Sequence, residues 1–179
     1  MTRTSLLAAV LGALLTNVAV AADWPTWRYD AQRSAASPAA LPEDLQLVWQ
    51  RQLPENHVAW SEDPRLQFDA GYEPIVVGKT MLVASARSDS ITALDTDSGQ
   101  ERWKFFADGP IRFAPVAWQG RAYFGADDGN VYCVEIASGK LAWKFNAAPT
   151  DRRVIGNDRL ISVWPVRGGA VVGDGKLYF

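Results

Sequence analysis

Cysteine and histidine are almost absent from this chain of 179 residues, in which Cys133 and His57 are the only examples. One thiol cannot form an internal disulfide, and one imidazole cannot build a multi-histidine metal site. A Ser-His-Asp triad is excluded unless His57 itself serves, and a single loop histidine is most often solvated. An excess of charge is also lacking, because the formal net charge of −2 favours neither a nucleic-acid partner nor an anionic membrane surface.

Apolar residues, in contrast, are abundant. They make up 48% of the chain and aromatic residues 11%, which is typical of a globular protein with a substantial core. Fourteen glycines and ten prolines are scattered along the chain. This distribution favours many short elements joined by turns.

Residues 1–21 have the layout of a secretory signal peptide. Arg3 is their only charge, an apolar stretch covers 6–15, and residues 19–21 are small, as a signal peptidase requires. An uncleaved anchor helix is the less favoured alternative, because Asn17 interrupts a stretch too short to span about 30 Å of hydrocarbon. We therefore expect cleavage and export to the periplasm or the extracellular space of a bacterium, without stable membrane insertion.

A repeat is the strongest pattern in the sequence. The segment ALDTDSGQERWKF at 93–105 recurs as CVEIASGKLAWKF at 133–145, so that its glycine and its tryptophan each return after 40 residues. The halves upstream of these segments also match, and a third copy begins at 169. A fixed period of this length is a signature of repeat architectures.

Each copy predicts four short strands separated by turn residues. The expected strands are 74–77, 81–85, 91–95 and 101–105 in the first copy, and 114–118, 122–125, 131–135 and 141–145 in the second. Four antiparallel strands in about 40 residues make one blade of a β-propeller. We therefore predict an all-β fold, a β-propeller of four-stranded antiparallel blades, present here as an incomplete N-terminal part.

The remaining segments complete the predicted organisation. We expect a signal peptide at 1–21, an N-terminal segment at 22–71, blades at 72–113 and 114–149, an inter-blade insertion at 150–168 and a truncated third blade at 169–179. Residues 45–51 alternate like a lone fourth strand and carry Trp49. We predict that this strand closes the ring by completing the last blade, with partner strands beyond Phe179.

The conspicuous residues of the repeat have structural roles in this interpretation. The predicted docking motif comprises Asp95, Gly99 and Trp103 in the first copy and Glu135, Gly139 and Trp143 in the second. The glycines suit a turn that needs a positive φ, and the acids can accept hydrogen bonds from that turn. The tryptophans lie on the outermost strand and can cover the junction with the next blade. Stacking on a ligand is the less favoured alternative, because that strand faces away from the central channel.

Arginines of the insertion and its surroundings are the candidate ligand or partner surface. The four residues are Arg112, Arg152, Arg153 and Arg167, whose guanidinium groups could meet an anionic ligand or partner. A solvated basic loop is the favoured alternative. The run 127–130 could be read as a calcium loop, but a hairpin turn is favoured because the distal Glu of an EF-hand is missing.

The pattern Ala-x-Asp-x-x-Ser-Gly-x-x-x-Trp resembles the tryptophan-docking motif of the PQQ-like (quinoprotein alcohol dehydrogenase-like) β-propeller family. The resemblance runs from about Trp24 to the end of the chain, and Glu135 is a mild departure from the aspartate of the motif. The family includes quinoprotein alcohol dehydrogenases and non-enzymatic members, among them the propeller subunit of the outer-membrane assembly machinery. A WD40 propeller is disfavoured because no Trp-Asp dipeptide occurs, and kelch repeats are longer.

Two functions are compatible with this resemblance. The favoured one is a non-catalytic binding or scaffold module of the cell envelope, holding a protein, peptide or glycan on one propeller face. The alternative is a PQQ-dependent alcohol or sugar dehydrogenase. The resemblance implies that such enzymes hold the quinone between a tryptophan and a vicinal cysteine disulfide, beside calcium and a catalytic aspartate. No residue here matches those roles, so we predict no catalytic, cofactor-binding or metal-binding residue, and PQQ with calcium only if further blades supply the site.

Overall fold

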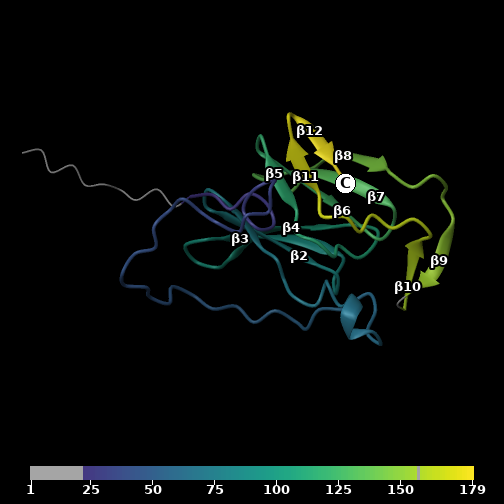
Figure 1. Ribbon diagram of the computed structural model, residues 1–179, viewed down its shortest axis with the longest axis horizontal. Helices are drawn as coiled ribbons and strands as arrows, with labels where there is room; N and C mark the ends of the chain where they lie inside the picture. The colour runs from purple at the N-terminus through teal and green to yellow at the C-terminus, as the bar shows by residue number, and fades with distance from the viewer. Residues whose placement is uncertain (1–21, 157) are drawn as a thin grey trace, which may run out of the picture.

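The computed structural model describes residues 22–156 and 158–179, and the predicted signal peptide lies outside this part (Figure 1). Two four-stranded antiparallel sheets form its centre, with strand orders β1-β2-β3-β4 and β5-β6-β7-β8. Their strands are β1 (Ile75–Val77), β2 (Thr80–Ser85), β3 (Ser90–Asp95), β4 (Glu101–Phe106), β5 (Val116–Trp118), β6 (Arg121–Gly125), β7 (Asn130–Glu135) and β8 (Leu141–Asn146). No strand end differs from the prediction by more than two residues, so the all-β prediction is confirmed.

The two sheets repeat each other in register as well as in order. Ala93 pairs with Trp103 in the first sheet, and Cys133 pairs with Trp143 in the second. Directly after Ala93 and after Cys133 the register of the last two strands shifts. The repeated sequence therefore encodes the same irregularity twice, as expected of a β-bulge that is a regular feature of the repeat.

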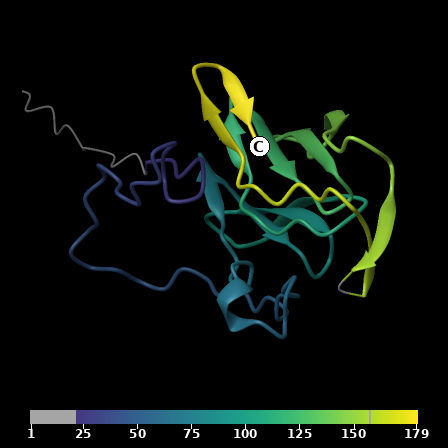
Figure 2. The ribbon, with the colours of Figure 1, turned by 45° about the vertical axis from the view of Figure 1, so that its right-hand side comes forward.

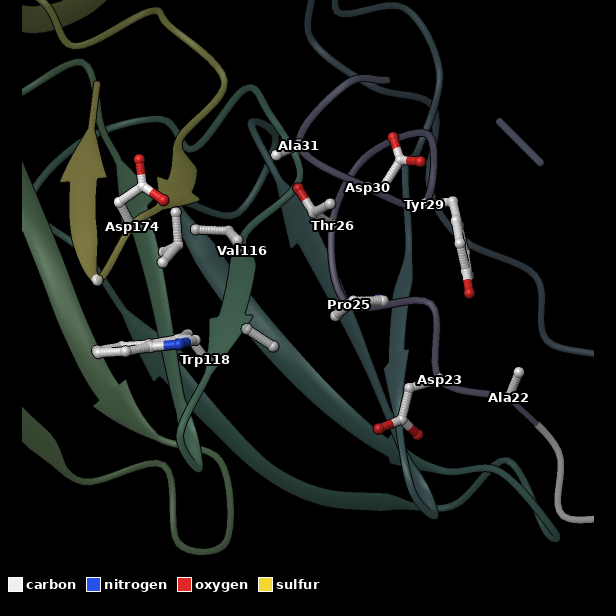
Figure 3. Close-up of a pocket in the computed structure, with 13 residues that line it drawn as sticks. Ala22, Asp23, Pro25, Thr26, Tyr29, Asp30, Ala31, Val116, Trp118 and Asp174 are labelled. Carbon is white, nitrogen blue, oxygen red and sulfur yellow. The ribbon is translucent and has the colours of Figure 1, made fainter. Parts of the chain in front are cut away.

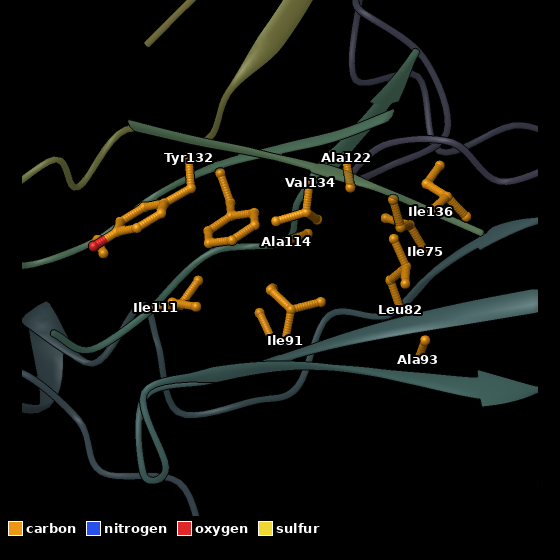
Figure 4. Close-up of a cluster of buried hydrophobic side chains, with 13 residues drawn as sticks. Ile75, Leu82, Ile91, Ala93, Ile111, Ala114, Ala122, Tyr132, Val134 and Ile136 are labelled. Atoms are coloured by element: carbon orange, nitrogen blue, oxygen red, sulfur yellow. The ribbon is translucent and has the colours of Figure 1, made fainter. Parts of the chain in front are cut away.

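The main core lies between the two sheets (Figure 4). Ile75, Leu82 and Ile91 of the first sheet face Phe124 and Val134 of the second, and all five are fully buried. Each such side chain contributes about 1.5–3 kcal/mol to the free energy of unfolding. The stacking of one sheet on the next therefore supplies much of the stability.

β7 shows why the strands carry near-continuous apolar runs. Tyr132 and Val134 point into the core shared with the first sheet, whereas Cys133 on the opposite face packs with Val116 and Ala170. A strand that is covered on both faces has no exposed row of side chains to alternate with. The second sheet thus lies between its predecessor and the start of a third unit.

That third unit is a hairpin of β11 (Val171–Gly173) and β12 (Lys176–Tyr178). Where the sequence favours a solvated basic loop, the insertion before it forms a second hairpin, β9 (Arg153–Gly156) and β10 (Arg159–Ser162). Figures 1 and 2 show this hairpin projecting beside the sheets. Arg159 ties it to the β2–β3 turn through the Asp89 carboxylate.

The N-terminal segment runs along the edge of the first two sheets. Trp24 exchanges both backbone hydrogen bonds with Val76 of β1, and Ala117 of β5 donates to the Pro25 carbonyl over 2.7 Å. A 3-10 helix, η1 (Pro64–Leu66), follows later. No strand is assigned at 45–51, so the ring-closing strand stays a prediction. In the part of the chain described, no helix is long and apolar enough to cross a bilayer.

The antiparallel meander gives each blade two distinct ends. The β1–β2 and β3–β4 turns, with their equivalents in the later units, form what we call the docking end. The β2–β3 and β6–β7 turns and the connections between units form the connecting end. The candidate sites divide between these two ends.

Candidate functional site

Trp103 on β4 joins the first blade to the second at the docking end. Its indole Nε1–H donates to the Ile136 carbonyl oxygen over 2.8 Å, and its ring lies on Gly139. Gly139 has a φ of 70°, and a Cβ there would come within 2.6 Å of the Trp103 ring. Glycine is thus required twice at this turn, for its backbone conformation and for the close approach of the ring.

Trp49 repeats the same contact one blade earlier. Its Nε1–H donates to the Thr96 carbonyl oxygen over 2.7 Å, and a Cβ on Gly99 would lie 2.6 Å from its ring. The sequence predicted Trp49 as part of a closing strand but did not identify the turn that it covers. The signal lay in the motif itself, because each motif glycine needs a tryptophan from the preceding unit.

Trp143 holds the equivalent place on β8 but has no docking turn within the described part of the third unit. Its side chain is tilted against Tyr123, with ring centroids 5.9 Å apart, and is 37% exposed. Phe145 and Leu141 on the same strand are also exposed. β8 therefore exposes a row of apolar side chains, whereas Trp103 and Phe105 on the equivalent strand β4 pack against the core that the first blade shares with the second.

The acidic residue of the motif holds the docking turn in shape. The Asp95 carboxylate accepts hydrogen bonds from the backbone N–H groups of Asp97 and Ser98 and from the Ser98 hydroxyl. The Arg102 guanidinium, followed by Ser98, lowers the pKa of Asp95 to about 2. In the second copy Glu135 still accepts from the Ser138 hydroxyl over 2.7 Å, so the longer acid keeps that contact.

A buried ionic cluster lies at the connecting end. Asp127, in the β6–β7 turn, is fully buried and accepts from Arg112 Nε over 2.7 Å and from Arg167 Nε over 2.8 Å. Arg112 also pairs with the buried Asp69, and Arg167 stacks over the Trp60 ring, 4.7 Å from its centroid. The cluster joins the N-terminal segment, the second blade and both flanking connections.

The structure thus separates the four predicted arginines into two pairs. Arg112 and Arg167 converge on Asp127, and the Arg112 guanidinium is almost fully buried between two carboxylates. The expectation that Arg112 offers itself to a ligand does not fit this burial, because its charge is already neutralised. Arg152 and Arg153 are exposed at the base of the β9–β10 hairpin and do not join the cluster.

The turn at 127–130 has the expected hairpin geometry, with Gly129 at a φ of 87°. Asp128 accepts from the Asn130 backbone and side chain, and from the Tyr132 hydroxyl over 2.6 Å. Burial, followed by the hydrogen bond to Asp128, raises the pKa of Tyr132. Sequence reasoning missed the role of Asp127, because nothing local distinguishes a turn carboxylate that pairs with distant arginines.

Metal ligands do not gather in the described residues, where no three His, Cys, Asp or Glu side chains are placed to hold one ion. Cys133 is buried in the core between the second blade and the third unit. The thiol is held there by packing, and its burial raises its pKa.

Comparisons with known proteins agree with this architecture. A family model described as "Outer membrane protein assembly factor BamB" matches residues 26–178. The 1-butanol dehydrogenase (cytochrome c) of Thauera butanivorans is 26% identical over 92% of this chain, which spans 24% of that protein. The quinohemoprotein alcohol dehydrogenase ADH-IIG of Pseudomonas putida is 28% identical over 68% of this chain and 18% of its own.

Among solved structures, the quinohemoprotein alcohol dehydrogenase of Comamonas testosteroni matches with a TM-score of 0.62 and 24% identity. The match covers 90% of this chain and 23% of that protein, and it shows the fold. The chain thus spans about a quarter or less of the length of these relatives. The docked blades and the family match over most of the described residues lead to one conclusion: the chain belongs to the PQQ-like β-propeller repeat family of BamB and the quinoprotein alcohol dehydrogenases.

Proposed function

We propose that this chain is part of an exported propeller that acts as a non-catalytic binding module of the cell envelope and holds a partner protein at its connecting end. The observation that carries the proposal is the β9–β10 hairpin. Ile155 and Leu160 lie directly opposite each other in it, 80% and 56% exposed. Exposed apolar side chains grouped in this way are typical of protein interaction sites.

The surroundings of the hairpin also suit a protein partner. Arg152 and Arg153 are exposed at its base and give the apolar pair a basic rim, which matches the apolar centre and polar rim of many interfaces. Arg159 anchors the hairpin to the first blade by donating to the Asp89 carboxylate and, over 2.9 Å, to the Arg87 carbonyl. A partner with apolar residues and an acidic border would complement this arm.

The ionic cluster beneath the hairpin supports the same assignment. Its two arginines and two aspartates neutralise one another, so the cluster holds segments of the chain together and has no free charge to bind a small anion. Ser162 at the end of β10 donates its backbone N–H to the Asp127 carbonyl over 2.8 Å. The hairpin is therefore mounted on the cluster, and its exposed face is left for a partner.

Site-specific photocrosslinking tests this proposal. A benzophenone amino acid replaces Ile155 in the full-length protein, and the same group replaces Lys140, an exposed docking-end residue, as the matched control. We expect a discrete adduct from position 155 that Leu160→Ser weakens, and none from position 140. The absence of an adduct at 155, or equal adducts at both positions, would contradict the assignment.

A quinone-dependent dehydrogenase is the second candidate. It is favoured by the match to the Thauera butanivorans enzyme, which extends over 92% of this chain. The resemblance implies a quinone held against a cysteine pair and calcium. The residues described here do not fit that site, because Cys133 is the only cysteine of the chain, cannot form a vicinal pair and is buried in the core. We therefore assign the cofactor no residue of this chain.

A further inference from the structure

The outer edge of β9 is the open edge of the hairpin to which we assign the partner. The inner strands of the two blades differ from it, because the N-terminal segment covers their edges. Trp24 exchanges backbone hydrogen bonds with Val76 of β1, and Ala117 of β5 donates to the Pro25 carbonyl. Figure 3 shows the segment with Pro25 passing beside β5, where the two line one pocket.

The register of the hairpin determines which backbone groups of β9 point outward. Successive residue pairs of an antiparallel ladder are alternately hydrogen-bonded and not hydrogen-bonded. Val163 donates to the Arg152 carbonyl over 3.0 Å, and Ile155 is paired with Leu160 three positions further along the same register. Ile155 therefore belongs to a pair without hydrogen bonds, and its N–H and C=O groups point away from β10.

β10 uses its outward backbone groups within the protein, whereas β9 does not. Ser162 holds the same place in the alternation as Leu160, and its backbone N–H donates to the Asp127 carbonyl over 2.8 Å. Within residues 22–156 and 158–179, the outward backbone groups of Ile155 have no such partner. A strand edge with unpaired backbone groups is a template for one more strand.

The outer strands of the blades are less suited to such pairing. β4 carries Lys104 and β8 carries Lys144 within the strand, and lysine on an edge strand opposes pairing with another chain. β9 has no lysine, and its only charged residue, Arg153, is its first. The edge of β9 is therefore the more open to an added strand.

The charge around β9 selects the kind of segment that can pair with it. Arg152 and Arg153 are exposed, and no ion pair of the described residues includes either of them. Like charges on facing strands are destabilising, so two copies of β9 paired with each other would bring their arginines into repulsion. An acidic segment complements this edge, and a second copy of this chain does not.

We propose that β9 binds an extended segment of the partner protein as an added antiparallel strand. An apolar residue of the segment lies opposite Ile155 and exchanges both backbone hydrogen bonds with it. An acidic residue two positions later in the segment lies opposite Arg153, because the two strands run in opposite directions. The inference rests on the proposed function and adds the way in which the partner is recognised.

Fluorescence anisotropy of labelled peptides with the full-length protein tests the inference. The peptide Thr-Thr-Val-Thr-Glu-Thr places its valine opposite Ile155 and its glutamate opposite Arg153. We expect a Kd below about 1 mM, and about fivefold weaker binding when lysine replaces the glutamate. Methylation of the valine backbone nitrogen should weaken binding about tenfold, because it removes the hydrogen bond to the Ile155 carbonyl. As the matched control, methylation of the next nitrogen, which points away from β9, should have a smaller effect.

Variants of the protein locate the binding. Arg153→Glu should reverse the preference, so that the lysine peptide binds more tightly than the glutamate peptide, and Lys140→Glu at the docking end should leave both affinities unchanged. No binding of the glutamate peptide, equal effects of the two methylations, or an unchanged preference in Arg153→Glu overturns the inference. Self-association of the protein that the peptide reverses also overturns it, in favour of a second copy on β9.

The photocrosslinking experiment separates this inference from the proposed function. An adduct at position 155 together with any of the contrary peptide results overturns strand addition alone, and the hairpin remains the partner site. The absence of that adduct contradicts the proposed function itself.

Discussion

Gly139→Ala tests the docking geometry most sharply, because its cost can be divided into two parts. A left-handed φ costs a residue with a Cβ about 1–2 kcal/mol, and Gly139 has a φ of 70°. The added Cβ also meets the Trp103 ring at 2.6 Å, and overpacking of this kind costs a further 1–3 kcal/mol. We expect a total loss of about 2–5 kcal/mol in the free energy of unfolding.

Gly78→Ala is the matched control, because Gly78 has a φ of 54° with nothing within 4 Å of the position of a Cβ. It should cost only the backbone part, about 1–2 kcal/mol. Trp103→Ala empties the space that the new Cβ would enter. In that background Gly139→Ala should cost no more than Gly78→Ala, which gives a coupling energy of about 1–3 kcal/mol between the two positions.

Urea unfolding and hydrogen exchange of the full-length variants measure these costs. Exchange should quicken first at 136–140 in the Gly139→Ala variant, because the Trp103 indole is hydrogen-bonded to the Ile136 carbonyl. Equal costs for Gly139→Ala and Gly78→Ala would refute the claim that the ring docks on this glycine. So would a full additional loss from Gly139→Ala in the Trp103→Ala background.

The structure makes three more predictions. The pKa of Asp95 is lowered to about 2 in the folded protein, so its ionised carboxylate stabilises the fold above the unfolded value near 3.8, and this stabilisation is lost as pH falls through about 2. The melting temperature of the Asp95→Asn variant should therefore fall less between pH 4 and 2 than that of the unchanged protein. Arg112→Met should lower the free energy of unfolding by about 3–5 kcal/mol in urea titrations, because it leaves Asp69 buried without its cation, whereas Arg152→Met should cost less than about 0.5 kcal/mol. Purified residues 22–179 should bind hydrophobic dyes through Leu141, Trp143 and Phe145, and Phe145→Ser should reduce the dye fluorescence; a sharp melt without dye binding would count against an apolar blade face.

The blades could be predicted from sequence because their information is local and occurs twice. Strands β1 to β8 follow from short apolar runs between turn residues, and the motif glycines indicate the turns that need a positive φ. The repeat also predicts which residues are equivalent, so Trp103 and Trp143 could be placed on the same strand of successive blades. Such local patterns can be interpreted without knowing the rest of the fold.

The ionic cluster could not be predicted, because its members come from four separate segments. Arg112 and Asp127 each look like exposed loop residues in the sequence, and only the folded path brings them together in the interior. The β9–β10 hairpin was missed for another reason. The residues Asn157-Asp158 between two apolar stretches are a turn signal, but a basic segment outside the repeat suggested a loop.

Titration of the full-length protein with PQQ and Ca²⁺ distinguishes a non-catalytic propeller from a quinone-dependent dehydrogenase. The absorbance of the quinone and the alcohol-dependent reduction of a redox dye are recorded together, with a quinoprotein alcohol dehydrogenase as the positive control. We expect the quinone to remain free and no alcohol or sugar to reduce the dye. Stoichiometric quinone binding with alcohol-dependent dye reduction would contradict it and identify the protein as a dehydrogenase.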